Sequence, residues 1–229
     1  MERPDERVYT LPFPALKLVV CDSLKPAVYD GADVTRRLAH PRKFDLLFVA
    51  SGVPLNVRGI SWFHEHVYLP YLRRHKVRLA IAGNVCRHFQ VQDAYIHRLF
   101  RIEGSLRELY AKAKIVIVPI FEGTGLSIKT LEGLAMGRAV ITTPVGSRGL
   151  GHGRGAFVQI DMRADPRGTA DAVLELLEDS ARREQLERSA MTFVGRYFSR
   201  EACFAALDQA MQRIGLVEAA APARLATYA

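Results

Sequence analysis

The stretch that decides the fold is residues 118–150, which read "VPIFEGTGLSIKTLEGLAMGRAVITTPVGSRGL". An apolar strand runs into a glycine-rich turn, the turn into a helical pattern, and the helix into a second apolar strand. Strands that are apolar along their whole length are typical of parallel sheets covered on both faces. The stretch therefore predicts a strand–helix–strand unit of a parallel sheet.

The same alternation extends in both directions. Apolar runs predict strands at residues 44–51, 77–83, 98–102, 114–120, 138–143 and 156–160. Apolar spacing predicts a helix over residues 56–75, interrupted at Pro70, and Ser105 with Glu108 has the spacing of a capping box. Asp165 and Pro166 begin the first of three closing helices, expected at residues 166–178, 180–196 and 200–213. Together these elements predict a Rossmann-like, doubly wound parallel sheet with C-terminal helices.

Three segments differ in composition. Residues 1–43 are rich in proline, with one short strand candidate at 17–22, and we expect a lead-in or linker. Residues 44–214 carry the strand–helix alternation and form the predicted Rossmann-like domain. Residues 215–229 are expected to be a disordered tail.

Composition excludes several classes of protein. The longest apolar runs span about seven residues, far below the roughly 20 of a membrane helix, and the N-terminus lacks the apolar core of a secretory signal. We therefore expect a cytoplasmic protein. The net charge of +8 would suit nucleic acid, but the basic residues are mixed with acids and no basic run is interleaved with aromatics. A phosphate-bearing ligand suits the excess charge, as does peripheral contact with the inner membrane face.

Cysteine and histidine give no metal or redox signal. Cys21, Cys86 and Cys203 are far apart and lack a CxxC spacing, so we expect idle thiols. His64 and His66 would point to different sides of a helix. The charged residues of 175–188 alternate as a solvated helix face would.

The glycine turn itself suggests a ligand. Gly123 and Gly125 let the backbone approach a ligand closely, and the following helix presents free N–H groups and a positive dipole end. Ser127 adds a hydroxyl and Lys129 a positive charge, while the Glu132 carboxylate can accept two hydrogen bonds from a vicinal diol such as a ribose. The alternative is a structural turn followed by a solvated lysine–glutamate pair. The residues alone predict an anion-binding turn suited to phosphate.

A longer pattern makes the interpretation specific. Residues 123–142 follow G-x-G-x-x-x-K-x-x-E-(A/G)-L-A-x-G-(K/R)-x-V-(I/V)-T, which resembles the donor-site segment of the group-1 (family-4) glycosyltransferases of GT-B fold. Further similarity lies in residues 44–63, 105–120, 144–150 and 196–207, so the resemblance covers about 44–213. It identifies the domain as the C-terminal, donor-binding half of such an enzyme.

The resemblance implies an activity and a set of site residues. It implies a retaining glycosyltransferase of polysaccharide biosynthesis, using a UDP- or GDP-linked sugar, a glycan or lipid-linked acceptor, and neither a metal nor another cofactor. The implied catalytic residues are Lys129 and Glu132. The implied donor-binding residues are these two together with Arg58, Ile102, Gly123, Thr124, Gly125, Leu126 and Ser127.

The chain also departs from the family pattern. Thr124 stands where many relatives have a second glutamate, with Glu122 two residues too early, and the loop after the first strand offers only Arg58 where many relatives carry an arginine and a lysine. The acceptor-binding half of a GT-B enzyme is not recognised in residues 1–43. A non-catalytic nucleotide-binding module, or one that depends on a partner chain, therefore stays open, as more weakly does a nucleotide-sugar epimerase. Residues 149–157 are expected either to lie over the donor or to be a mobile connector.

Overall fold

The computed structural model describes residues 42–213, except residues 103, 152 and 154. Within them, six parallel strands form one sheet in the order β3-β2-β1-β4-β5-β6. Their bounds are β1 Phe44–Val49, β2 Leu79–Ala82, β3 Ile96–Leu99, β4 Ala113–Val118, β5 Ala139–Thr142 and β6 Val158–Gln159. The predicted Rossmann-like, doubly wound fold is confirmed, since this is the strand order of that class.

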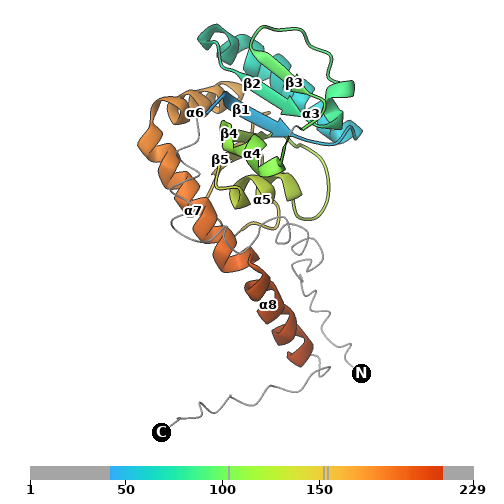
Figure 1. Ribbon diagram of the computed structural model, residues 1–229, viewed down its shortest axis with the longest axis vertical. Helices are drawn as coiled ribbons and strands as arrows, with labels where there is room; N and C mark the ends of the chain where they lie inside the picture. The colour runs from blue at the N-terminus through green and yellow to red at the C-terminus, as the bar shows by residue number, and fades with distance from the viewer. Residues whose placement is uncertain (1–41, 103, 152, 154, 214–229) are drawn as a thin grey trace.

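Helices cover both faces of the sheet (Figure 1). One face packs against α3 Pro54–Phe63, the π-helical segment η2 His64–Leu72, and α6 Pro166–Glu178. The other packs against α4 Leu106–Ala111, α5 Ile128–Ala135 and α7 Ser180–Phe198. The remaining helical elements are the 3₁₀ turns η3 Arg73–His75 and η4 Asn84–Arg87, and α8 Arg200–Arg213, which extends α7 away from the sheet.

Each face of the sheet has its own hydrophobic core, and the central strands contribute side chains to both. On β1, Leu46 belongs to the core under α3 and Leu47 to the core under α5, and the paired residues Ile115 and Val116 of β4 divide in the same way. Burial on both faces explains why these strands read as continuous apolar runs.

Two helix starts match the sequence signals. The Ser105 hydroxyl accepts a hydrogen bond from the Glu108 amide at 3.2 Å, and the Asp165 carboxylate accepts one from the Gly168 amide at 2.8 Å. Pro166 occupies the first turn of α6. Both predicted caps are confirmed.

Three predictions are wrong in detail. Pro70 lies inside η2 and does not interrupt the helical path, because the wider π-helical turns accommodate a residue without an N–H. Strand β3 covers Ile96–Leu99 and not residues 98–102, since this edge strand is only half-buried and carries polar residues. Glu187 is 1% exposed and not solvated, because it pairs with Arg42 at 3.0 Å and with Arg138 at 3.8 Å.

Some predictions lie outside the described residues. They concern the strand at 17–22, Cys21, the tail at 215–229 and nearly all of the lead-in, and they stay predictions. Within the described part of the chain, no helix is both long and apolar enough to cross a bilayer.

The strand order places the switch point of the sheet between β1 and β4. The chain passes from β1 outward to β2 and β3, then returns to β4 on the other side of β1. The loops after β1 and β4 therefore leave the same sheet edge side by side, where open α/β sheets bind ligands.

Asp45 ties the opposite, amino edge of the sheet together. Its carboxylate accepts hydrogen bonds from the Arg78 amide at 2.9 Å and guanidinium at 3.1 Å, and lies 2.9 Å from the Lys114 ammonium. Burial raises the pKa of Asp45, but these hydrogen bonds and charges outweigh it and lower the pKa to about 2.

This lowered pKa predicts a pH dependence of stability. The contribution of ionised Asp45 is fully present above its unfolded pKa of 3.8 and is lost as pH falls toward 2. We expect Asp45→Asn to lower the free energy of unfolding by about 2 kcal/mol at pH 7 and by roughly half as much near pH 3, measured by urea unfolding. Asp171→Asn, in an exposed pair on α6, is the control. An equal deficit for Asp45→Asn at both pH values would contradict this account.

Candidate functional site

The glycine turn, residues 119–127, connects β4 to α5 at the switch point. Gly123 has φ +135° and Gly125 φ +76°, conformations that residues with a side chain rarely adopt. A Cβ added at either glycine would meet no described atom within 4 Å. The glycines are therefore required by the backbone conformation, and the turn borders open space that a ligand can enter.

Helix α3 holds one side of the glycine turn. A Cβ at Gly59 would lie 2.0 Å from the Pro119 carbonyl oxygen, so the helix backbone packs directly on the end of β4. The Trp62 ring meets the Phe121 ring edge-on, with centroids 4.9 Å apart, and the Arg163 guanidinium covers the Phe121 ring at 4.3 Å. These contacts fix where the turn begins.

Arg58 reaches the glycine turn, where it is already paired. Its guanidinium lies 2.9 Å from the Glu122 carboxylate, and both side chains are about half exposed. An ion pair this exposed is weak, about 0–1 kcal/mol, and a stronger anion can replace the carboxylate. Glu122 was not predicted to hold Arg58, because nothing in the sequence links two residues 64 positions apart.

Hydroxyl groups hold the other side of the turn. The Thr143 hydroxyl, after β5, donates to the Ile120 carbonyl. The buried Thr130 hydroxyl of α5 donates to the Gly146 carbonyl at 2.5 Å and lies 3.2 Å from the Thr142 hydroxyl. The glycine turn and the start of α5 are thus fixed to the end of β5.

Ser127 begins α5 without capping it. Its extended backbone occupies the N-cap position, but its side chain caps no helix amide and instead lies 3.3 Å from the Thr130 hydroxyl oxygen. The free N–H groups of the first turn of α5 remain available to an anion.

Lys129 and Glu132 are half-buried on α5, and Glu132 has a partner that sequence reasoning missed. The fully buried Tyr110 of α4 donates a hydrogen bond to the Glu132 carboxylate at 3.1 Å. In the described chain no ion pair within 4 Å joins Lys129 to Glu132. The alternative of a solvated lysine–glutamate pair is therefore wrong.

Burial moves both groups toward their neutral forms. It raises the pKa of Glu132, against the opposing effects of the Tyr110 hydrogen bond and Lys129, and it lowers the pKa of Lys129, against the charge of Glu132. Groups whose pKa values are shifted by burial together with a charged neighbour cluster at functional sites.

The remaining predicted residues divide into two groups. Thr124 and Leu126 lie in the glycine turn, and Leu126 packs against Gly149, where a Cβ would be 3.1 Å from its side chain. Ile102 is more than one third exposed and lies in the segment that runs from β3 back to α4 along the carboxyl edge. Strands β2 and β1 separate β3, which Ile102 follows, from β4, which the turn follows.

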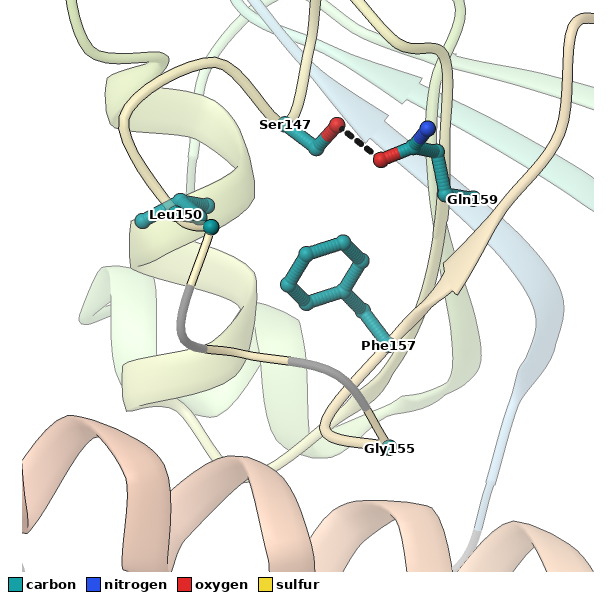
Figure 2. Close-up of a pocket in the computed structure, with 6 residues that line it drawn as sticks. Ser147, Leu150, Gly155, Phe157 and Gln159 are labelled. Atoms are coloured by element: carbon teal, nitrogen blue, oxygen red, sulfur yellow. Dashed lines mark hydrogen bonds between the residues drawn. The ribbon is translucent and has the colours of Figure 1, made fainter.

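A cavity of about 420 Å³ opens beside the site (Figure 2). It is lined by Ser147, Leu150, Gly151, Gly155, Phe157 and Gln159, and the Ser147 hydroxyl bonds the Gln159 side chain at 2.7 Å across it. None of the predicted site residues is among its lining residues.

Histidines and cysteines form no cluster here. Among described residues no group of three or more histidine, cysteine or acidic side chains could hold a metal ion. His64 is buried between the Tyr68 and Phe89 rings, whereas His66 is exposed and stacks on Trp62. The two histidines point to different sides, as predicted.

Comparison with known proteins decides the family. A family model described as glycosyl transferases group 1 matches residues 43–179, more than half of the chain. The chain belongs to the group 1 glycosyl transferases. The resemblance predicted from the glycine turn and its flanks is confirmed.

Among curated proteins, this group 1 chain is similar to an uncharacterized 44.6 kDa protein in the cps region of Klebsiella pneumoniae. The two are 22% identical over 188 residues, which cover 73% of this chain and 48% of the relative. The chain thus spans about half the length of that relative.

Solved structures establish the fold. Anabaena Alr3699/HepE in complex with UDP matches with a TM-score of 0.60 at 13% identity, over 82% of this chain and 53% of that one. The C-terminal domain of the group 1 protein LpcC from Francisella tularensis matches with a TM-score of 0.56 at 14% identity, over 76% of this chain and 96% of that domain. The chain therefore has the fold of one half of a GT-B protein.

The Tyr110–Glu132 hydrogen bond predicts that replacing Tyr110 destabilises the protein by an amount that depends on pH. Tyr110→Phe removes a donor to a buried carboxylate, and we expect a loss of about 1–2 kcal/mol in the free energy of unfolding at pH 7. Because the pKa of Glu132 is raised, the folded state takes up a proton as pH falls toward 4.5. A protonated carboxyl depends less on the Tyr110 hydroxyl, so the loss in the free energy of unfolding should be smaller at pH 5 than at pH 7. Urea unfolding at the two pH values measures it, with Tyr71→Phe at a half-buried position on η2 as control. A loss that grows on acidification would refute this assignment.

Proposed function

We propose that this chain is the donor-binding half of a retaining glycosyltransferase. The enzyme would transfer a sugar from a nucleotide-diphosphate sugar to a glycan or lipid-linked acceptor. The observation that carries the proposal is the open glycine turn at the switch point, which leads into an uncapped helix carrying half-buried Lys129 and Glu132.

The diphosphate would lie at the start of α5. There the backbone amides of residues 123–127 and the positive end of the helix dipole favour negative charge. Lys129, within the first turn, adds a cation beside them. Arg58 would leave Glu122 for the phosphates, since their ion pair is exposed and weak.

The ribose would bind Glu132. Tyr110 occupies only one oxygen of the carboxylate, so the other oxygen and the free lone pairs can accept from a vicinal diol. The Tyr110 hydrogen bond also fixes the orientation of the carboxylate. The base would extend along the carboxyl edge toward Ile102.

The chemical step requires stabilisation of a leaving diphosphate. Lys129, Arg58 and the α5 terminus would neutralise the charge that develops as the bond to the sugar breaks. This role needs no metal ion, and we place none in the site. The Anabaena structure of the same fold is a UDP complex, which favours UDP as the first nucleotide to test.

The second candidate function is that of a module that acts only when a second protein domain covers the carboxyl edge of its sheet. In the described chain, seven large hydrophobic side chains are at least 36% exposed, and five of them follow the ends of β1, β3 and β4: Val53, Leu55, Phe100, Ile102 and Ile128. Apolar side chains gathered at one edge mark an interaction surface. These exposed side chains favour a second domain at the carboxyl edge, supplied by the same protein or by a partner chain.

Nucleotide binding tests the proposal. UDP or GDP at about 100 times its dissociation constant should add ~2.7 kcal/mol to the free energy of unfolding and raise the melting midpoint by roughly 5–10 °C. We expect this rise to be lost in Glu132→Ala and reduced in Glu132→Gln, which keeps an acceptor for the Tyr110 hydroxyl. Glu184→Gln, on the exposed side of α7, is the matched control and should behave as wild type. Cooperative unfolding with no rise for either nucleotide would reject the donor site.

A further inference from the structure

The loop after β5, residues 143–150, lies along the glycine turn. An Arg148 guanidinium nitrogen donates to the Gly123 carbonyl at 2.5 Å. Gly149 packs on Leu126, and the Gly146 carbonyl accepts from Thr130. Three residues of this loop therefore contact the turn and the start of α5. Arg148 and Gly123 meet although they are 25 positions apart in the sequence.

Arg148 differs from Arg58 and Lys129, two other cations at the turn. Arg58 is held by the Glu122 carboxylate, and Lys129 is half-buried with its pKa lowered. Arg148 is exposed, and in the described chain no carboxylate lies within 4 Å of its guanidinium. Its hydrogen bond to Gly123 fixes the side chain beside the turn without neutralising its charge.

The geometry of the guanidinium suits a phosphate. One of its five N–H donors is used by the Gly123 carbonyl, and the others remain for a ligand. A planar guanidinium presents paired donors that match two phosphate oxygens. The neighbouring space is open, since a Cβ at Gly123 would meet no described atom within 4 Å.

We propose that Arg148, from the loop after β5, binds the diphosphate of the donor. The inference rests on the proposed function, because it places a residue in the same donor site. It assigns Arg148 to the phosphates and not to the base or the ribose. Its effect should therefore scale with the charge of the ligand.

The test compares charged and uncharged ligands on the full chain. Dissociation constants are measured for UDP and GDP by calorimetry, and for uridine and guanosine by NMR titration. Arg148→Gln keeps a polar side chain with N–H donors but removes the charge. We expect it to weaken diphosphate binding by about 10–100-fold, the range of a hydrogen bond to a charged group. Nucleoside binding should change less than about twofold, because the nucleoside has no phosphate.

Two further variants sharpen the comparison. Arg148→Lys keeps the charge but loses the paired donors, so its affinity should fall between the wild type and Arg148→Gln. Arg188→Gln removes the same charge from α7, where Arg188 faces Glu184, and should leave every constant unchanged. Urea midpoints confirm that each variant is folded.

The outcomes separate the two proposals. Selective loss of diphosphate binding in Arg148→Gln supports the inference. Unchanged binding, or an equal loss for nucleosides and diphosphates, overturns it and leaves the donor site standing. A wild-type chain that binds neither UDP nor GDP overturns the proposed function, and the inference with it.

Discussion

Parallel pairing of β1 with β4 is the constraint on which the candidate site depends. The register aligns Leu46 with Ile115 and Leu47 with Val116, so both strands end at the same level of the sheet edge. The start of α3 and the glycine turn then leave the sheet side by side. Without that pairing, Gly59 could not rest on the Pro119 carbonyl, and Arg58 could not reach Glu122.

Charge is distributed unevenly between the two edges of the sheet. At the amino edge, each of two buried carboxylates is shared by two cations: Asp45 by Arg78 and Lys114, and Glu187 by Arg42 and Arg138. At the carboxyl edge, Lys129 and Arg148 have no such partner in the described chain, and the α5 dipole adds to their field. These two cations at the carboxyl edge lie where an anionic ligand would bind, and neither is held in an ion pair by a described residue.

Much of the fold was predictable because its signals are local. Continuous apolar runs give the central strands, and Ser105 and Asp165 give helix starts within three residues of themselves. Glu187 escaped prediction because its partner Arg42 lies 145 positions away, and β3 was misplaced because a half-buried edge strand carries a weak apolar pattern.

The candidate site shows the same division. Gly123, Gly125, Lys129 and Glu132 were found because they lie within ten residues and their chemistry repeats a family pattern. The Tyr110 partner of Glu132 and the contact of Arg148 with Gly123 depend on how α4 and the loop after β5 pack, which spacing does not encode.

The half-buried pair on α5 links ionisation to ligand binding. In the unliganded site, burial favours neutral Lys129 and protonated Glu132. A phosphate beside Lys129 would favour its charged form, and ribose hydroxyls donating to Glu132 would favour its carboxylate. A nucleotide would thus supply an anionic partner to Lys129 and further hydrogen-bond donors to Glu132, beyond the one from Tyr110, whereas a ligand with only the phosphate or only the diol would leave one of the two groups opposed by burial. Under the proposed function, recognition of the whole nucleotide follows from placing a lysine and a glutamate one turn apart where neither can satisfy the other.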